Sequence, residues 1–290
     1  MLDVVFEMDK AANMADFRQA VSKLAAPGLN ISYIDTRGNI DWWAAGRLPI
    51  RPAHVSGKKI HNGSSENDEA LGYLPFESNP HLVNPENGLI ITANNLPTFT
   101  PIDPIGVLTG YFRPSDRAAR IYELLSQKEK WTLEELKEIQ ADAKLFAAPG
   151  MTASILAILT AEKSSFTQSE QKAFKALSSW DELMGTQTIG GTVFQFTLYH
   201  ILKQALEPHI GPDNLKTYLN LVDHWDFLKK LLKTDQIPVR GTNSNLSPNT
   251  REAIVLAGFK NAINEITTTL GPMKKTGHGD LFTPLNMSMP

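Results

Sequence analysis

The chain has 290 residues, with 28 Lys and Arg against 31 Asp and Glu, which gives a formal net charge of −3. This balance is typical of a globular protein and argues against a polybasic nucleic-acid binder or an acidic disordered tail. Cysteine is absent, so disulfides, thiolate nucleophiles and cysteine-bound metal clusters are excluded. No apolar run approaches the roughly 20 residues of a membrane span. We therefore expect a protein that binds no nucleic acid and crosses no membrane.

The first 113 residues are rich in Gly, Pro and Asn and contain short β-prone runs. Apolar residues at helical spacing from Met14 to Leu24 predict one helix ahead of these runs, ended by Pro27 and Gly28. The runs cover residues 30–35, 39–45 and 88–93. The first two flank a short turn that ends in Gly38, which predicts a tight hairpin.

From residue 115 onward the apolar spacing becomes helical. Thr132 with Glu135, and Thr167 with Glu170, have the spacing of capping boxes. The predicted helices cover residues 118–125, 132–146, 151–160, 168–178, 192–206, 213–232 and 249–270, and residues 234–249 are predicted to form a polar loop. The expected fold class is α+β, with a mixed α/β part over residues 1–113 and a mainly helical region over residues 114–290.

Common catalytic signatures are absent from the sequence. No two histidines have the HExxH spacing of a zinc site, and the sequence lacks a phosphate-binding P-loop and a GxSxG elbow. The β-prone run 88–93 is followed by Asn94 and Asn95. An Asn amide at a strand end can donate to a developing oxyanion. The same two residues are also good turn formers, and the residues alone favour the turn.

Three linked segments carry a family resemblance. They read NISYIDTRGNIDWWAAGRLPIR (30–51), LGYLPFESNPHLVNPENGLIITANNLP (71–97) and RPSDRAARIYELL (113–125). In this order they resemble the β chain of the penicillin acylase (penicillin amidase) family of N-terminal-nucleophile hydrolases. Weaker similarity at residues 140–142 and 177–181 extends the resemblance to about residues 10–270.

The resemblance implies part of an αββα-type N-terminal-nucleophile hydrolase core followed by a helical segment. It also implies hydrolysis of a small acyl amide of the penicillin, cephalosporin or acyl-homoserine lactone type. In the family an N-terminal serine attacks the carbonyl while its own α-amino group takes the proton. Carried over, Asn94 is the oxyanion-hole donor and Arg117 is the arginine that organises the site. From the residues alone, Arg117 could instead form a helix-surface salt bridge.

The nucleophilic serine has no credible counterpart in this chain. Gly63-Ser64 is expected in a surface loop, and Ser244 follows Asn243 rather than a glycine. The serine would come from upstream α/β segments of the same precursor, and the chain by itself is expected to be inactive. Strands whose partners lie in those segments would present unpaired edges. The alternatives are an inactive remnant or interaction domain of the same family, and an unrelated α+β binding domain.

Three further expectations rest on the resemblance. The family uses calcium, but no ligand can be assigned here, because residues 52–59 match the family pattern poorly. The family's closing tryptophan is missing, and His278 is the candidate remnant of that motif. Family members are mostly periplasmic, whereas a chain expressed from Met1, which begins without an export signal, would stay in the cytoplasm.

Overall fold

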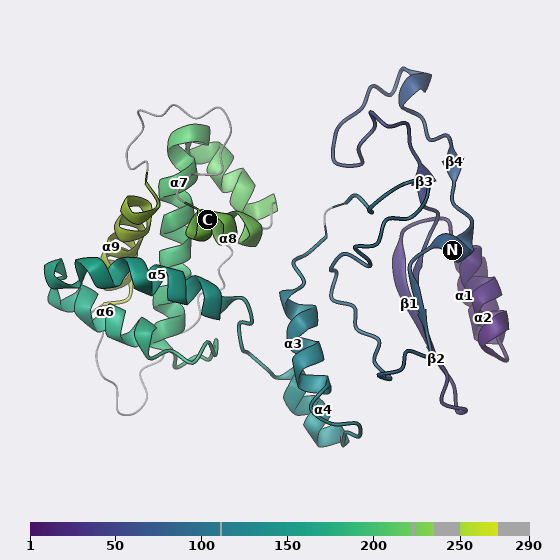
Figure 1. The fold of residues 1–290 in the computed structure, drawn as a ribbon, viewed down its shortest axis with the longest axis horizontal. Helices are drawn as coiled ribbons and strands as arrows, with labels where there is room; N and C mark the ends of the chain where they lie inside the picture. Colours follow the sequence, from purple (N-terminus) through teal and green to yellow (C-terminus); the bar gives the residue numbers. More distant parts are fainter. Residues whose placement is uncertain (111, 222–223, 235–249, 272–290) are drawn as a thin grey trace. The chain divides into compact units, whose positions relative to one another are not determined.

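The computed structural model describes residues 1–110, 112–221, 224–234 and 250–271 (Figure 1). The chain divides into two compact units, Met1–Lys130 and Trp131–Pro290. The predicted change to helical structure at residue 114 falls just before α3 (Asp116–Leu125), which belongs to the first unit. The domain limits 1–113 and 114–290 stay a prediction. None of the described helices is both long and apolar enough to cross a bilayer.

The first unit is built around a small antiparallel sheet. Its strands are β1 (Leu29–Ile34), β2 (Ile40–Ala45) and β5 (His81–Val83), in the order β1-β2-β5. The predicted hairpin is confirmed: Ile34 pairs with Ile40, and Gly38 takes the left-handed conformation in the turn with φ 85°. A second sheet joins β3 (Pro49–Ile50) to β4 (Gly72–Tyr73), and short 3-10 turns cover Glu66–Asp68 and Phe76–Ser78.

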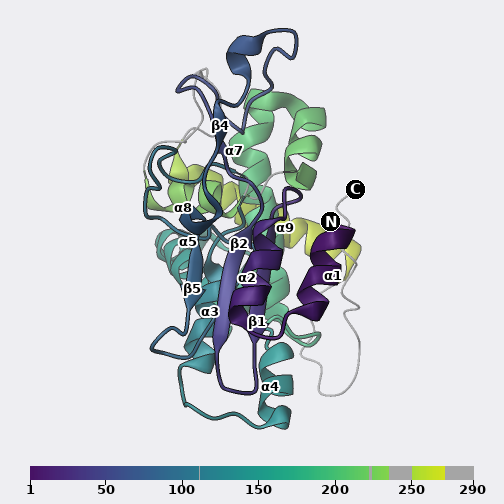
Figure 2. The same cartoon turned by 90° about the vertical axis from the view of Figure 1, so that its right-hand side faces the viewer.

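One helix packs against this sheet, and a second helix packs against the first (Figure 2). The predicted helix is α2 (Met14–Ser22), and it buries Phe17 and Val21 in a cluster with Trp43 of β2. The other helix, α1 (Leu2–Lys10), was not predicted, because Val4 is its only fully buried residue. Trp43 is also stacked against Phe76 and His81, with ring centroids 4.4 and 4.2 Å apart.

The outer edge of β1 is open, as the sequence predicts. Among the described residues β1 pairs with β2 alone. Apolar side chains at both ends of this strand reach solvent, with Leu29 42% and Ile34 77% exposed. An edge of this kind offers unpaired backbone groups to another strand.

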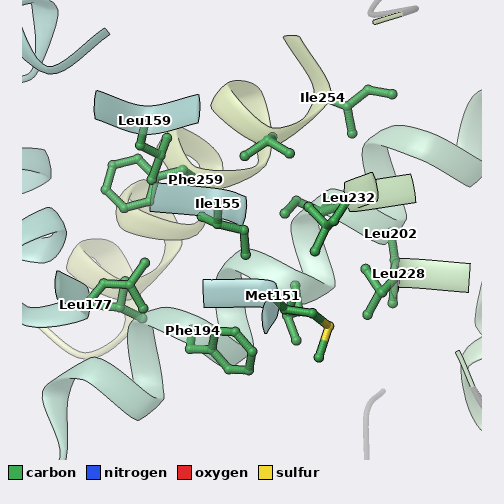
Figure 3. Close-up of a cluster of buried hydrophobic side chains, with 14 of the residues drawn as sticks. Met151, Ile155, Leu159, Leu177, Phe194, Leu202, Leu228, Leu232, Ile254 and Phe259 are labelled. Atoms are coloured by element: carbon green, nitrogen blue, oxygen red, sulfur yellow. The ribbon is translucent and has the colours of Figure 1, made fainter. Parts of the chain in front are cut away.

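The second unit is helical. Its helices are α4 (Leu133–Gln140), α5 (Ala148–Glu162), α6 (Gln168–Ser178), α7 (Ile189–Leu221), α8 (Trp225–Lys233) and α9 (Arg251–Thr269), with a 3-10 turn at Lys163–Ser165. Both predicted capping boxes are confirmed at the starts of α4 and α6. Side chains from five helices meet in one core, as Ile155, Leu177, Phe194, Leu228 and Phe259 illustrate (Figure 3).

Several predicted boundaries were wrong. The helix predicted over 132–146 ends at Gln140, where Asp142 accepts a hydrogen bond from the Lys144 amide and closes a local turn instead. The break predicted between residues 206 and 213 is confirmed within α7, because Gly211 has a non-helical φ of 77° and two helical stretches meet there at a kink. Among the described residues, the run 88–93 forms no strand. The loop predicted at 234–249 lies, apart from Thr234, outside the described residues.

Candidate active site

Asn94 sits at a sharp bend in the long irregular segment between β5 and α3. Its φ of 62° is left-handed, a conformation that asparagine tolerates better than most residues. Asn95 holds the bend from inside, because its Oδ1 accepts from the Ala93 amide at 3.0 Å and its Nδ2 donates to the Leu96 carbonyl at 3.1 Å. The Arg113 amide donates to the Asn94 carbonyl at 2.8 Å. Hydrogen bonds therefore fix the backbone on both sides of Asn94.

Arg117 lies in the first turn of α3 and reaches back to this bend. Its Nη2 donates to the Ala93 carbonyl at 2.5 Å and to Asn94 Oδ1 at 2.9 Å. The structure thus brings together the two residues that the sequence singled out. Within the described part of the chain, the Arg117 guanidinium bonds to these two oxygens and to no carboxylate. The surface salt bridge is therefore not what the structure shows here.

The contact with Arg117 determines which way the Asn94 amide points. A guanidinium carries only donors, so the side-chain atom of Asn94 that faces it must be the oxygen. The amide nitrogen, with two hydrogens, is then turned away from Arg117. Asn94 is an exposed residue. Its NH2 group is consequently free to donate to an oxygen that approaches from outside, which is the geometry that an oxyanion donor needs.

The structure describes only one of the other residues considered for the site, which are Ser64, Ser244 and His278. Gly63 and Ser64 form an exposed turn in which Ser64 Oγ donates to Asn62 Oδ1 at 2.7 Å, which confirms the predicted surface loop. Ser244 and His278 lie outside the described residues. Sequence reasoning missed the part played by Asn95, although its place directly after Asn94 in a pair of turn formers was the available signal.

The calcium that the resemblance implies stays a prediction. No group of three or more His, Asp or Glu side chains among the described residues is arranged to hold a metal. Calcium takes six to eight oxygen ligands, usually with several carboxylates. The described residues therefore assign no ligand to such an ion.

Comparison with known proteins identifies the family. Residues 1–283 match the family described as penicillin amidase. The chain belongs to the penicillin amidase family. It is 30% identical to penicillin G acylase from Escherichia coli over 183 residues, which cover 59% of this chain and 20% of that protein. It is 29% identical to the penicillin acylase 2 proenzyme from Pseudomonas sp. (strain SE83) over 140 residues, which cover 48% of this chain and 18% of that protein.

The fold is also shared with a solved member of the family. A thermostable penicillin G acylase from Alcaligenes faecalis matches 98% of this chain with a TM-score of 0.65 and 20% sequence identity. The matched part is 57% of that chain. The matches thus span about a fifth of each curated relative. The α+β fold class and membership of the penicillin amidase family are therefore established, and the catalytic roles of Asn94 and Arg117 stay predictions.

Proposed function

We propose that the chain is part of a penicillin-acylase-like amidohydrolase that hydrolyses a small acyl amide of the penicillin, cephalosporin or acyl-homoserine lactone type. Asn94 supplies one oxyanion-hole donor, and Arg117 orients it. The nucleophilic serine and the remaining donor come from polypeptide outside these residues. The observation that carries the proposal is the bond from Arg117 Nη2 to Asn94 Oδ1, because it turns the Asn94 NH2 group outward.

The proposed mechanism assigns one role to each residue. When a serine oxygen attacks the amide carbonyl, negative charge develops on the carbonyl oxygen. The Asn94 NH2 group donates to that oxygen, and it needs no reorganisation because the bend and Arg117 already hold it. The positive charge of Arg117 polarises the Asn94 amide, which makes its hydrogens better donors. Arg117 itself does not touch the reacting atoms and is a positioning residue.

The test uses the complete enzyme, with this chain produced together with the upstream part of its precursor. Asn94→Ala should lower kcat about 10²–10³-fold, as expected for loss of an oxyanion donor, with a much smaller change in KM. Asn87→Ala, an exposed asparagine in the same irregular segment, is the matched control and should keep full activity. An Asn94→Ala enzyme with unchanged kcat would refute the role.

A second candidate is an interaction domain of the same family without turnover. The open edge of β1, with its exposed apolar residues, is the observation that favours it. In that case the chain binds its partner polypeptide, but the assembly hydrolyses no acyl amide. Turnover that is lost in the Asn94→Ala variant would exclude this candidate.

A further inference from the structure

A cleft of about 570 Å³ lies within the first unit. Residues 93 and 94, which form the bend described above, are not among the residues that line it. One wall comes from the segment around β3 and includes Leu48, Pro52 and Val55, and the other comes from residues 104–109 and includes Ile105 and Leu108. Its volume is within the range of small-molecule sites, and most of the residues that line it are apolar, while polar atoms make up about half of its exposed lining.

The second wall is a closed loop. The Ile102 and Gly106 backbones exchange two hydrogen bonds, from the Ile102 amide at 2.9 Å and from the Gly106 amide at 2.7 Å. Gly106 has a φ of 70°, which its lack of a side chain permits. Ile105 lies inside this closed loop and is therefore presented to the cleft by a braced segment.

Arg51 is the charged residue on the cleft lining. Every other arginine in the described ranges has a side-chain partner or another interaction, for example Arg18 with Asp41 and Arg47 with the Tyr73 ring. Within those ranges, the Arg51 side chain has no hydrogen bond, ion pair or ring contact. No Asp or Glu lies on the cleft lining to neutralise it.

The surroundings of Arg51 favour an anion. The stretch from Arg51 to Lys59 contains two further lysines and no acidic residue. A methyl group added at Gly57 would lie 3.8 Å from Thr109 Oγ1 and 3.9 Å from Arg51 Nη2, so the hydroxyl and the guanidinium approach the same point over Gly57. A planar carboxylate matches the fork of a guanidinium and accepts a second bond from a hydroxyl.

We propose that this cleft binds a carboxylate with an apolar body, such as a medium-chain fatty acid or an aromatic acid. The carboxylate pairs with Arg51 over Gly57, and the apolar body lies between Val55 and Ile105. The proposal does not depend on the proposed amide hydrolysis, because neither Asn94 nor Arg117 lines the cleft.

The experiment is a ligand-observed NMR titration of the full chain with octanoate and its neutral counterpart octanamide. We expect saturable octanoate binding and at least about tenfold weaker octanamide binding, because the neutral amide lacks the negative charge and the second acceptor oxygen that pair with a guanidinium. Arg51→Gln should remove the preference for octanoate. Arg37→Gln, which alters an exposed arginine of the β1–β2 turn, should keep it.

A second pair of variants keeps the test valid if Arg51→Gln disturbs the fold. Val107 lies on the cleft lining and is 44% exposed, so a polar side chain is tolerated there. Val107→Glu supplies a carboxylate that competes for Arg51 and should weaken octanoate binding at least about tenfold, whereas Val107→Gln should not. Equal binding of octanoate and octanamide by the wild type would overturn the proposal, as would an undiminished preference in Arg51→Gln or unweakened binding by Val107→Glu.

Discussion

Replacing Gly258 by alanine should destabilise the helical unit, although alanine is the better helix former. Gly258 of α9 lies against α7, and a Cβ there would be 2.8 Å from Ile201 Cγ1 and 2.9 Å from the Ile201 backbone nitrogen. The side-chain atom can move by a rotamer change, but the nitrogen belongs to the helix. Overpacking of this kind costs about 1–3 kcal/mol, and the backbone contact places it near the upper value. Subtracting roughly 1 kcal/mol of helix propensity leaves a net loss of about 2 kcal/mol.

The assay is urea unfolding followed by far-UV circular dichroism, to which the helices of the second unit contribute strongly. Gly150→Ala in α5 is the matched control, because nothing lies within 4 Å of its added Cβ. We expect this control to gain about 0.4–1 kcal/mol. If Gly258→Ala were as stable as the wild type while Gly150→Ala behaved as expected, the close approach of α7 and α9 at this point would be wrong.

Three smaller predictions concern single contacts. Hydrogen bonds, first from the Asn39 side chain and then from the backbone amides of Asn39 and Arg37, lower the pKa of the Asp35 carboxyl from 3.8 to about 2. The stability that this carboxylate adds is complete above about pH 4 and is lost as the pH falls towards 2, and Asn39→Ala should raise its pKa in a carbon-13 NMR titration. Arg18→Met leaves the fully buried Asp41 without its cation and should cost about 3 kcal/mol, measured by hydrogen exchange in β2. Thr167→Ala removes a capping hydroxyl and should cost about 1 kcal/mol in thermal unfolding.

A different result would contradict each of these three predictions. An Asp35 pKa that stays the same in Asn39→Ala would show that backbone donors alone hold the carboxylate. Unchanged exchange of the β2 amides in Arg18→Met would mean that Asp41 does not depend on its ion pair. For the helix cap, Thr167→Ser keeps the hydroxyl and should restore stability, and a serine variant as unstable as the alanine variant would contradict the capping role.

Elements that depend on local signals could be predicted from the sequence. The hairpin at Gly38, the helix from Met14 and both capping boxes appear where their turn formers and caps place them. The strand predicted over residues 88–93 was wrong, and the reason lies outside those residues. Strand propensity describes how well a residue fits a pleated surface beside a neighbouring strand, and no described segment pairs with residues 88–93.

At the candidate site, too, local sequence could not predict what depends on tertiary contacts. The resemblance could select Asn94 and Arg117, because both fall on motif positions. Whether Asn94 presents a donor or an acceptor depends on which side-chain atom faces Arg117, a residue 23 positions away. No local pattern contains that information. It follows from the left-handed bend at Asn94, which Asn95 braces through the Ala93 amide, and from the start of α3, which places a group with donors only beside the amide oxygen. The chemistry of the amide is therefore set by the tertiary contact.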